Sequence, residues 1–454
     1  MRTWHPGLRG RAARQLRRAW RYGPPVILAA SFAVLIVLGA LLLWLPVASV
    51  DGLSLWQALF TACSAVTVTG LVVVDTGAQL TLFGQSVVLV LIHLGGLGLM
   101  TFAALTVMAL GGRFGLRGQR LVREALDQTS PGDVLALVRH VALLAFTLEA
   151  VGVALLATVW VPEMGWARGL WFSLFHAVSA FNNAGFGLLP ESLSAWAGHP
   201  LVNLVITALF IIGGLGFTVV VDLWRRRRFR ALTLHSKLTL VGTLVLAVGG
   251  GLLVLLLEWN NARTLGALPV GERFWAAWFT AVTPRTAGFN TVDTAGLGVP
   301  AMLLVMFLMF IGGGSNSTAS GIKVSTFMVL LLSTRAFLMG NAQTTIFRRA
   351  VARDAVFRAH AVVMLSLILL ALAGFILVVL APKQAPLDVF FEAVSAFGTV
   401  GLSRGITADL SAPAQGVLML LMFVGRIGPL AFAYALARPR PAKVRFTEDQ
   451  VQIG

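Results

Sequence analysis

The sequence predicts an all-α, polytopic membrane protein built from four related repeats. Two properties point to the membrane: 57% of the 454 residues are hydrophobic, and only 12% are charged, which is typical of chains that cross a bilayer several times. The third observation is a motif that recurs about every 110 residues, in which a short apolar segment ends in a glycine-containing turn. Each repeat is therefore predicted to contain a span, a re-entrant helix, a loop and a second span. The pseudo-fourfold plan gives eight transmembrane helices and four re-entrant pore loops.

The repeats account for almost the whole chain. In order, we expect a basic N-terminal arm (1–22), repeat 1 (23–112), repeat 2 (113–224), repeat 3 (225–340), repeat 4 (341–437) and a C-terminal tail (438–454). Apolar runs long enough to cross a bilayer predict first spans at 24–46, 134–161, 238–258 and 360–381. Shorter runs predict re-entrant helices at 53–66, 166–181, 272–282 and 386–397. The return spans are expected at 84–111, 200–223, 299–338 and 414–437.

The charge distribution supports this topology and excludes a nucleic-acid partner. The net charge is +17, but the basic residues lie between apolar spans rather than on one folded face. Of the 35 Lys and Arg residues, 28 fall in segments that the plan places inside the cell and 6 in segments that it places outside. This bias predicts that both termini are cytoplasmic and that all four loops face outward. The N-terminal arm is also expected to contact anionic lipid.

No residue pattern suggests an enzyme or a covalently bound cofactor. The sequence contains no Walker A motif, no cluster of zinc ligands and no nucleophile paired with a base. Cys63 is the single cysteine, which excludes an internal disulfide and leaves no thiolate cluster for a metal. We expect Cys63 to be a packing residue of the first re-entrant helix.

The glycine-containing turns are the candidate binding site for a dehydrated cation. Irregular backbone survives at membrane depth only where it is buried in protein or lines water, and rings of carbonyl oxygens can replace the hydration shell of an ion. Glycine allows the carbonyls to turn inward, and the negative ends of the re-entrant helix dipoles favour a cation. The alternative is that these glycines serve only close helix packing. The predicted coordinating residues are Val68, Thr69, Gly70, Asn183, Ala184, Gly185, Thr286, Ala287, Gly288, Thr399, Val400 and Gly401.

The third loop differs from the others in spacing. Three serines precede their glycine by six residues, whereas Thr283 precedes Gly288 by five. Arg285 also lies directly before the predicted coordinating residues. We expect its side chain to point away from the axis and to brace the loop, because a guanidinium on the ion path would repel a cation.

A second candidate site interrupts the return span of repeat 3. The small and polar residues that follow Ile311 cannot form a stable lipid-facing helix, and discontinuous helices of this kind mark ion pathways. The alternative is a merely kinked helix. Lys323 either caps the lower end of a blocked path or extends to the cytoplasm. The residues predicted to form a gate loop are Gly312, Gly313, Gly314, Ser315, Asn316, Ser317, Thr318, Ala319, Ser320 and Gly321.

Three further charges are predicted inside the membrane: Arg426, Glu149 and Glu392. A charge at that depth is expensive and is usually functional. Arg426 lies in the middle of the last span, and the alternative to a functional role is an ion pair with a buried acid such as Glu149. Glu392 lies in the fourth re-entrant helix and is expected to brace a loop.

The four-loop plan, with its sequences TVTGLVVVDTG, AFNNAGFG, VTPRTAGFNTVD and AFGTVGLS, resembles the Trk/Ktr/HKT potassium transporter superfamily. The resemblance covers about residues 25–437. It is closest to the membrane-embedded, ion-translocating subunit of the bacterial Ktr system. Trk-type members carry two extra N-terminal helices, and one span is predicted here before the first loop. In the family, serine in place of the first loop glycine goes with sodium transport, so Gly70 implies potassium selectivity.

The resemblance also implies mechanism, location and partners. It implies uptake of potassium across the bacterial inner membrane, with 312–321 as an intramembrane gate and with Lys323 and Arg426 beside it. It implies a homodimer resting on a ring of cytosolic nucleotide-binding regulatory subunits. The basic segments 112–140, 225–237 and 335–358 are candidate contacts for that ring, and the alternative is that their charge serves only to set the membrane topology. A sodium or mixed sodium/potassium transporter of the same superfamily and a Trk-type subunit remain alternatives, and sodium could act as a coupling or activating ion.

Overall fold

The structure is a computed structural model that describes residues 24–98 and 134–437. The predicted N-terminal arm, the C-terminal tail, the second half of the first return span and most of the basic segment 112–140 lie outside the described residues. The described chain is mostly helical, as predicted.

The helices follow the same order four times along the described chain. A long helix comes first in each unit: α2 (Pro24–Leu43), α7 (Val134–Met164), α11 (Leu234–Glu258) and α15 (Arg353–Leu380). A shorter helix follows: α3 (Leu55–Thr67), α8 (Trp166–Phe181), α12 (Val270–Val282) and α16 (Pro386–Gly398). After a loop, the return helices begin as α4 (Leu82–Gly96), α9 (Pro200–Leu215), α13 (Val299–Phe310) and α17 (Ala412–Ile427). Three of them are followed by α10 (Phe217–Arg226), α14 (Val324–Leu338) and α18 (Pro429–Ala437).

Short elements complete the chain. The 3₁₀ turns are η1 (Pro46–Ala48), η2 (Ser194–Trp196), η3 (Phe229–Ala231), η4 (Leu265–Ala267), η5 (Thr294–Gly296) and η6 (Thr407–Asp409). An antiparallel hairpin of β1 (Thr345–Ile346) and β2 (Arg349–Ala350) joins α14 to α15. This hairpin was not predicted, because its strands are two residues long and carry no alternating pattern.

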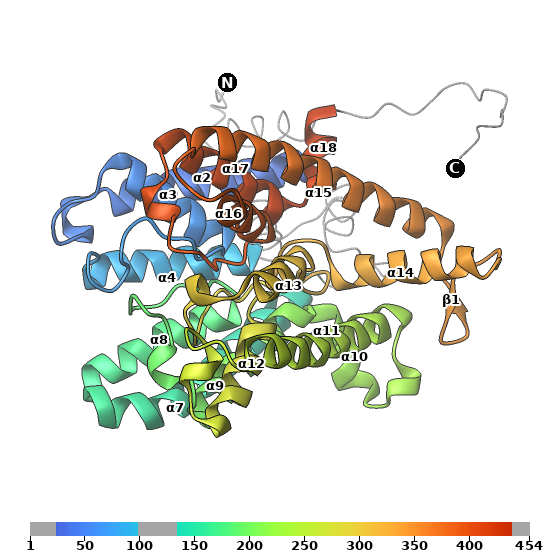
Figure 1. Cartoon of the computed structure of the whole chain (residues 1–454), viewed down its shortest axis with the longest axis horizontal. Coiled ribbons are helices and arrows are strands. Elements are labelled where there is room, and N and C mark those ends of the chain that lie inside the picture. Colours follow the sequence, from blue (N-terminus) through green and yellow to red (C-terminus); the bar gives the residue numbers. More distant parts are fainter. Residues whose placement is uncertain (1–23, 99–133, 438–454) are drawn as a thin grey trace, which may run out of the picture.

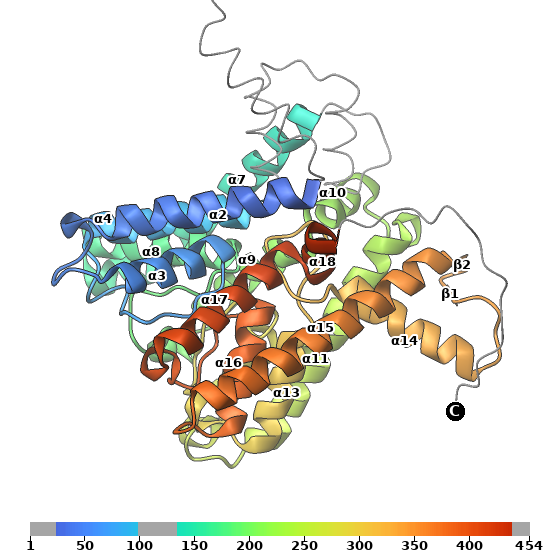
Figure 2. The same cartoon turned by 90° about the horizontal axis from the view of Figure 1, so that it is seen from above.

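The four units are arranged in a circle. The return helix of each unit contacts the short helix of the next: α4 contacts α8, α9 contacts α12, and α13 contacts α16. The contact of α17 with α3 brings the last unit against the first, and Figures 1 and 2 show these red and blue helices side by side. The loops that follow the four short helices therefore come together from all parts of the chain.

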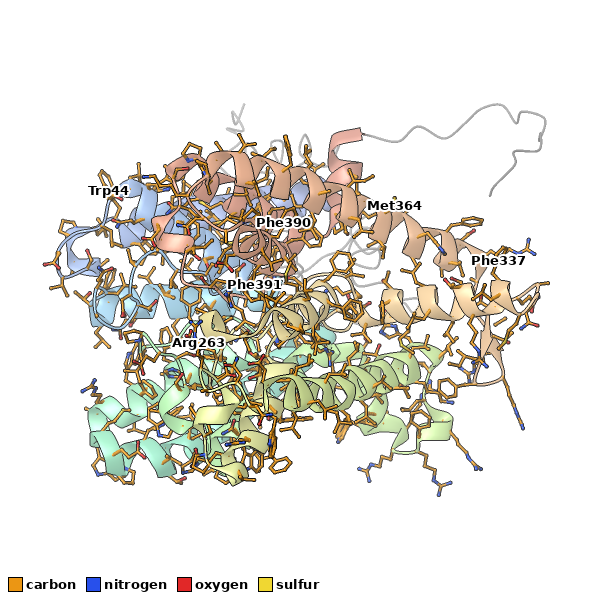
Figure 3. The ribbon with its side chains drawn as sticks, in the orientation of Figure 1. Trp44, Arg263, Phe337, Met364, Phe390 and Phe391 are labelled. Atoms are coloured by element: carbon orange, nitrogen blue, oxygen red, sulfur yellow. The ribbon has the colours of Figure 1, made fainter. Side chains whose placement is uncertain are left out.

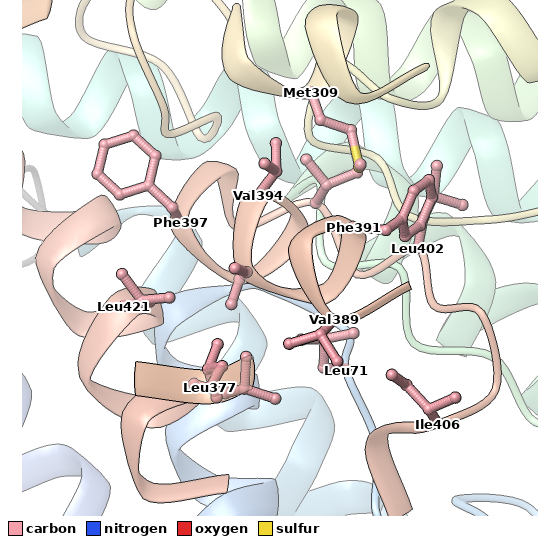
Figure 4. Close-up of a cluster of buried hydrophobic side chains, with 14 of the residues drawn as sticks. Leu71, Met309, Leu377, Val389, Phe391, Val394, Phe397, Leu402, Ile406 and Leu421 are labelled. Atoms are coloured by element: carbon pink, nitrogen blue, oxygen red, sulfur yellow. The ribbon is translucent and has the colours of Figure 1, made fainter. Parts of the chain in front are cut away.

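The buried apolar clusters join neighbouring units. The cluster in Figure 4 combines side chains of α13, α15, α16 and α17 with Phe60 and Leu71 of the first unit. A second cluster joins Phe181 of α8 to Phe279 of α12. Among membrane helices, lipid is as apolar as the protein interior, so this packing stabilises the circle through close van der Waals contact.

The outer helices carry features of membrane-exposed segments. In the described part, Val141–Met164, Leu234–Glu258 and Arg353–Leu380 are long and apolar enough to cross a membrane, and the bent pair α9–α10 makes a fourth if it is one span. Met364 of α15 and Phe337 of α14 point outward in Figure 3 and are 61% and 82% exposed. The count of eight crossings stays a prediction.

The expectation of continuous return spans at 200–223 and 414–437 was wrong. Gly216 and Gly428 have φ angles of +97° and +95° and separate α9 from α10 and α17 from α18. The α9 and α10 axes differ by 96°. Glycine adopts a positive φ at little cost, and a residue with a positive φ cannot continue a right-handed helix. The predicted interruption of the third return span is confirmed, since α13 ends at Phe310 and α14 begins at Val324.

Candidate functional site

The four loops share one unusual backbone conformation. Each loop contributes three consecutive predicted coordinating residues, which we call its triplet. In each triplet the first and third residues have positive φ, and the third is always glycine. A non-glycine residue in this region costs about 1–3 kcal/mol and persists only where the surroundings hold it, and β-branched residues are rare there. The φ angles are +57° and +89° for Val68 and Gly70, +59° and +68° for Asn183 and Gly185, +73° and +77° for Thr286 and Gly288, and +47° and +92° for Thr399 and Gly401.

Hydrogen bonds to the short helices hold the triplets in this conformation. The amide of the middle residue donates to the carbonyl oxygen of a serine or threonine in the last turns of its own helix. Among the described residues, none of the triplet carbonyl oxygens accepts a recorded backbone or side-chain hydrogen bond. Those oxygens remain available to a ligand. The amide bonds run from Thr69 to Ser64 (2.8 Å), Ala184 to Ser179 (2.8 Å), Ala287 to Thr283 (2.9 Å) and Val400 to Ser395 (2.9 Å).

The hydroxyl groups of these four helix residues brace the loops in two ways. In loops 1 and 4, the serine oxygen accepts from the glycine amide at 3.1 Å. In loops 2 and 3, the hydroxyl donates to the carbonyl of the phenylalanine after the glycine, at 2.8 Å from Ser179 and 2.6 Å from Thr283. Thr283 therefore matches Ser179 although it lies one residue nearer to its glycine.

The loop glycines meet in a closed ring, which we call the glycine ring (Gly70, Gly185, Gly288 and Gly401). A Cβ atom on Gly70 would lie 3.1 Å from the Cα of Gly185, and one on Gly185 would lie 2.9 Å from the oxygen of Ala287. A Cβ on Gly288 would lie 3.2 Å from the carbonyl carbon of Val400, and one on Gly401 would lie 3.0 Å from the Cα of Gly70. Each glycine faces the next loop's backbone at a distance that leaves no room for a side chain.

Arg285 points away from the ring, as expected. Its guanidinium donates to the carbonyl oxygen of Thr243 at 3.3 Å and to the hydroxyl of Thr243 at 3.2 Å. Thr243 belongs to α11, so the contact ties the third loop to the first helix of its own unit.

The predicted gate residues 312–321 form a docked, non-helical segment, which we call the gate segment. Ile311 and Ile322 form a parallel bridge at its base. The amide of Gly314 donates to Gly214 O at 2.7 Å, and the amide of Thr318 donates to Gly213 O at 3.2 Å. The break between α9 and α10 frees these carbonyls, so the gate segment satisfies the broken helix end.

Arg426 links the gate segment to the end of α4. One side of its guanidinium donates to Thr318 O and to Ser320 Oγ, the latter at 3.1 Å. The other side donates to the carbonyls of Gly95 and Gly96, the latter at 3.0 Å. A cation at a helix C-terminus also interacts favourably with the helix dipole.

The alternative pairing of Arg426 with Glu149 was wrong. Glu149 lies 3.3 Å from His93 Nδ1 and accepts from the side-chain amide of Asn182 at 2.9 Å. This acid therefore contacts the residue that precedes the second triplet. The sequence could not show the pairing because it joins α4, α7 and α8.

Lys323 is bound to the gate segment. Its ammonium group donates to Ala319 O at 2.7 Å. Lys323, Arg426 and Phe217 line a cavity of about 170 Å³ beside the segment. The role of Lys323 at the end of an ion path stays a prediction.

Glu392 braces the fourth loop, as expected. One carboxylate oxygen accepts from the hydroxyl of Ser403 at 2.7 Å and from the amide of Arg404 at 2.9 Å. The other accepts from the hydroxyl of Thr407 at 2.8 Å. The guanidinium of Arg404 also binds Asp388 at 2.9 Å, a contact that was not predicted.

Comparisons with known proteins agree on one family. A family model described as "TrkH: Cation transport protein" matches residues 18–444. The chain is 48% identical over 435 residues to the "Ktr system potassium uptake protein B" of Bacillus subtilis (strain 168), with 96% of this chain and 97% of that protein covered. It is 45% identical to the protein of the same name from Vibrio alginolyticus, with 95% of each chain covered. It is 38% identical to the "Potassium/sodium uptake protein NtpJ" of Enterococcus hirae, with 96% and 98% covered.

A solved structure has the same fold. The potassium transporter TrkH from Vibrio parahaemolyticus superposes with a TM-score of 0.69 at 19% identity. The match covers 91% of this chain and 84% of that chain. At this identity the likeness shows the fold alone.

Proposed function

The chain belongs to the TrkH family of cation transport proteins, and we propose that it carries potassium into the cell as the ion-translocating subunit of a Ktr-type system. The observation that carries this proposal is the glycine ring. Four loops close on one another with unbonded carbonyl oxygens, and the backbone leaves no room for side chains at the glycines. This arrangement suits a bare alkali cation.

The ring would act as the selectivity filter. Carbonyl oxygens from Val68, Thr69 and Gly70 and their counterparts replace the water that potassium loses on entry. The short helices end at the loops, so their negative dipole ends favour a cation. The ion then moves inward down its electrochemical gradient, which supplies about 2.3 kcal/mol per charge per 100 mV.

The gate segment would control passage below the ring. In this structure it is held by Gly213, Gly214 and Arg426. The charges of Arg426 and Lys323 also oppose a cation that leaves the ring. Opening therefore requires the segment to leave its contacts with α9 and Arg426.

The assembly follows from the same proposal. We infer eight spans in four repeats with the repeat boundaries predicted from the sequence, with the second and fourth return spans broken at Gly216 and Gly428, both termini in the cytoplasm, and a location in the bacterial cell membrane. The word "system" in the names of two relatives supports further components. We propose a homodimer on a ring of nucleotide-binding regulatory subunits, with segments 225–237 and 335–358 as contact surfaces.

A sodium or mixed sodium/potassium transporter is the second candidate. A relative that is 38% identical carries "potassium/sodium" in its name. Gly70 favours the potassium transporter, because the family's sodium transporters carry serine at this position. The Cβ atom of a serine here would meet Ala184 O and displace loop 1 from loop 2.

The test is rescue of growth on low potassium in an uptake-deficient bacterium, with the regulatory subunit supplied. We expect growth, and we expect rubidium uptake that potassium competes for and sodium does not. Lack of rescue would contradict potassium transport, and equal competition by sodium would favour the second candidate. Rubidium uptake measured with and without sodium separates simple flow from sodium-coupled transport.

Gly70→Ser tests the ring assignment in the same assay. The new side chain has no room beside loop 2, so the ring must shift and its potassium preference over sodium should weaken. The measurement is the sodium concentration that halves rubidium uptake. An unchanged value would count against the filter.

A further inference from the structure

A chain of side-chain hydrogen bonds connects the gate segment to the glycine ring. The hydroxyl of Thr318 donates to Asn183 Oδ1 at 2.7 Å, and Asn183 Nδ2 donates to the hydroxyl of Thr286 at 3.3 Å. All three residues are at most 1% exposed. Thr318 belongs to the gate segment, whereas Asn183 and Thr286 are the first residues of the second and third triplets.

We propose that Asn183 is a positioning residue through which the gate segment sets the ion preference of the ring. The inference rests on the proposed function and adds to it. A gate that only blocks would change the flux of all ions equally. A gate that is bonded to Asn183 also changes the geometry of the loops that choose between ions.

The backbone beside Thr318 and Asn183 leaves space for their hydrogen bond. A Cβ atom on Gly213 would lie 2.9 Å from the hydroxyl oxygen of Thr318 and 3.1 Å from Asn183 Oδ1. Glycine at position 213 therefore leaves the space that the bond occupies. The Thr318 hydroxyl also lies 3.3 Å from Phe181 O, in the last turn of α8, so both of its acceptors belong to the second unit's loop and short helix.

The link is confined to half of the ring. The equivalent positions in loops 1 and 4 are Val68, which has no polar side-chain atom, and Thr399, whose hydroxyl has no partner within the described residues. Movement of the gate segment therefore acts on loops 2 and 3 directly and on the other two only through ring contacts.

Release of the gate segment has a defined consequence for Asn183. Its buried amide would lose the bond from Thr318, and buried polar groups rarely stay unpaired. The side chain must turn toward another partner. Asn183 has a φ of +59° and lies two residues before Gly185. Rotation of its side chain therefore moves the carbonyl groups of the second loop.

Thr318→Val tests the link, because it removes the hydroxyl and keeps the shape. We measure rubidium uptake in cells with the regulatory subunit present, and titrate sodium as competitor. Loss of one buried hydrogen bond should change the rubidium-over-sodium preference by about fivefold. Thr318→Ser, which keeps the hydroxyl, should restore the wild-type preference.

Thr286→Val breaks the chain from the other end without touching the gate segment. Since both variants act through Asn183, the double variant should shift the preference no further than the larger single variant. A double variant whose shift equals the product of the two single shifts would overturn the proposal.

The matched control is Thr147→Val. Its hydroxyl donates only within α7, to Leu143 O at 2.7 Å, so preference and flux should stay at wild-type values. If the wild-type chain takes up no rubidium, the proposed function fails. If the wild type transports and Thr318→Val changes flux but not preference, the function stands and this inference fails.

Discussion

The glycine ring repeats one arrangement four times, whereas the return helices beneath it contain three unequal breaks within the residues that the structure describes. Every triplet in the ring has the same pair of positive φ angles and the same amide bond to its own helix. Below it, single glycines break α9 from α10 and α17 from α18, while the gate segment separates α13 from α14. Under the proposed function, symmetry is kept where several equal ligands would surround one ion, and it is abandoned where one movable segment would be enough.

The two regions also differ in what holds them. The triplet amides bond to the helices that carry them, so each loop is braced within its own unit. The gate segment is held by α9 and by Arg426 of α17, and Arg426 in turn bonds to the end of α4, so these contacts reach the three other units. The ring backbone should therefore move less than the gate segment, and the bonds of Asn183 to Thr318 and Thr286 are where gate movement reaches it.

The largest expected effect comes from filling the ring. Gly288→Ala places a Cβ against the backbone of Val400, while Gly52→Ala places one in open space. Both glycines have positive φ, +77° and +79°, so both variants carry a similar backbone strain of about 1–2 kcal/mol. We expect Gly288→Ala to lose nearly all rubidium uptake and Gly52→Ala to keep most of it.

Equal uptake by these two variants would break the comparison, because the ring would then tolerate side chains. Comparable amounts of both proteins in the membrane fraction are the necessary control.

An intermediate effect is expected from the gate. Arg426→Gln removes most of the bonds that hold the gate segment to α4, so rubidium uptake without the regulatory subunit should rise several-fold. Arg426→Lys keeps the charge but cannot bridge both groups of acceptors. If bridging matters, the lysine variant will also leak; if charge alone blocks the ion, it will behave like the wild type.

The smallest effect on transport, with a clear effect on stability, is expected at Glu392. Glu392→Leu leaves the donors of Ser403, Arg404 and Thr407 without their acceptor, at about 1–3 kcal/mol for each group that stays unpaired. Glu392→Gln keeps the shape and most of the bonds. Thermal unfolding in detergent should show a lower melting temperature for the leucine variant only.

If the two Glu392 variants unfold alike, the negative charge rather than the hydrogen bonds holds loop 4. The brace of that loop would then differ in kind from those of the other three.

Glycine spacing located the residues that share this backbone conformation. Each predicted triplet ends at a glycine with positive φ, and the gate segment begins where small residues replace the apolar run after Ile311. These features are visible in sequence because one residue type is required for a steric reason. Their role in ion binding stays a prediction.

Other features depend on contacts that no single segment contains. The break at Gly428 escaped prediction because apolar residues continue on both sides and hydropathy does not change. The break between α9 and α10 is stabilised by the gate segment, about a hundred residues later in the chain, through bonds such as Phe217 N to Asn316 O at 2.9 Å. The positive φ of Val68 was equally hidden, since β-branched residues avoid that conformation unless tertiary contacts impose it.

Closure of the ring depends on a contact between residues near opposite ends of the chain. Gly401 contacts Gly70. A chain that lacks the fourth loop therefore forms only an open arc of three loops. Under the proposed function, such an arc gives a bare cation too few oxygen ligands to replace its lost water. A chain that lacks the fourth loop is therefore not expected to conduct.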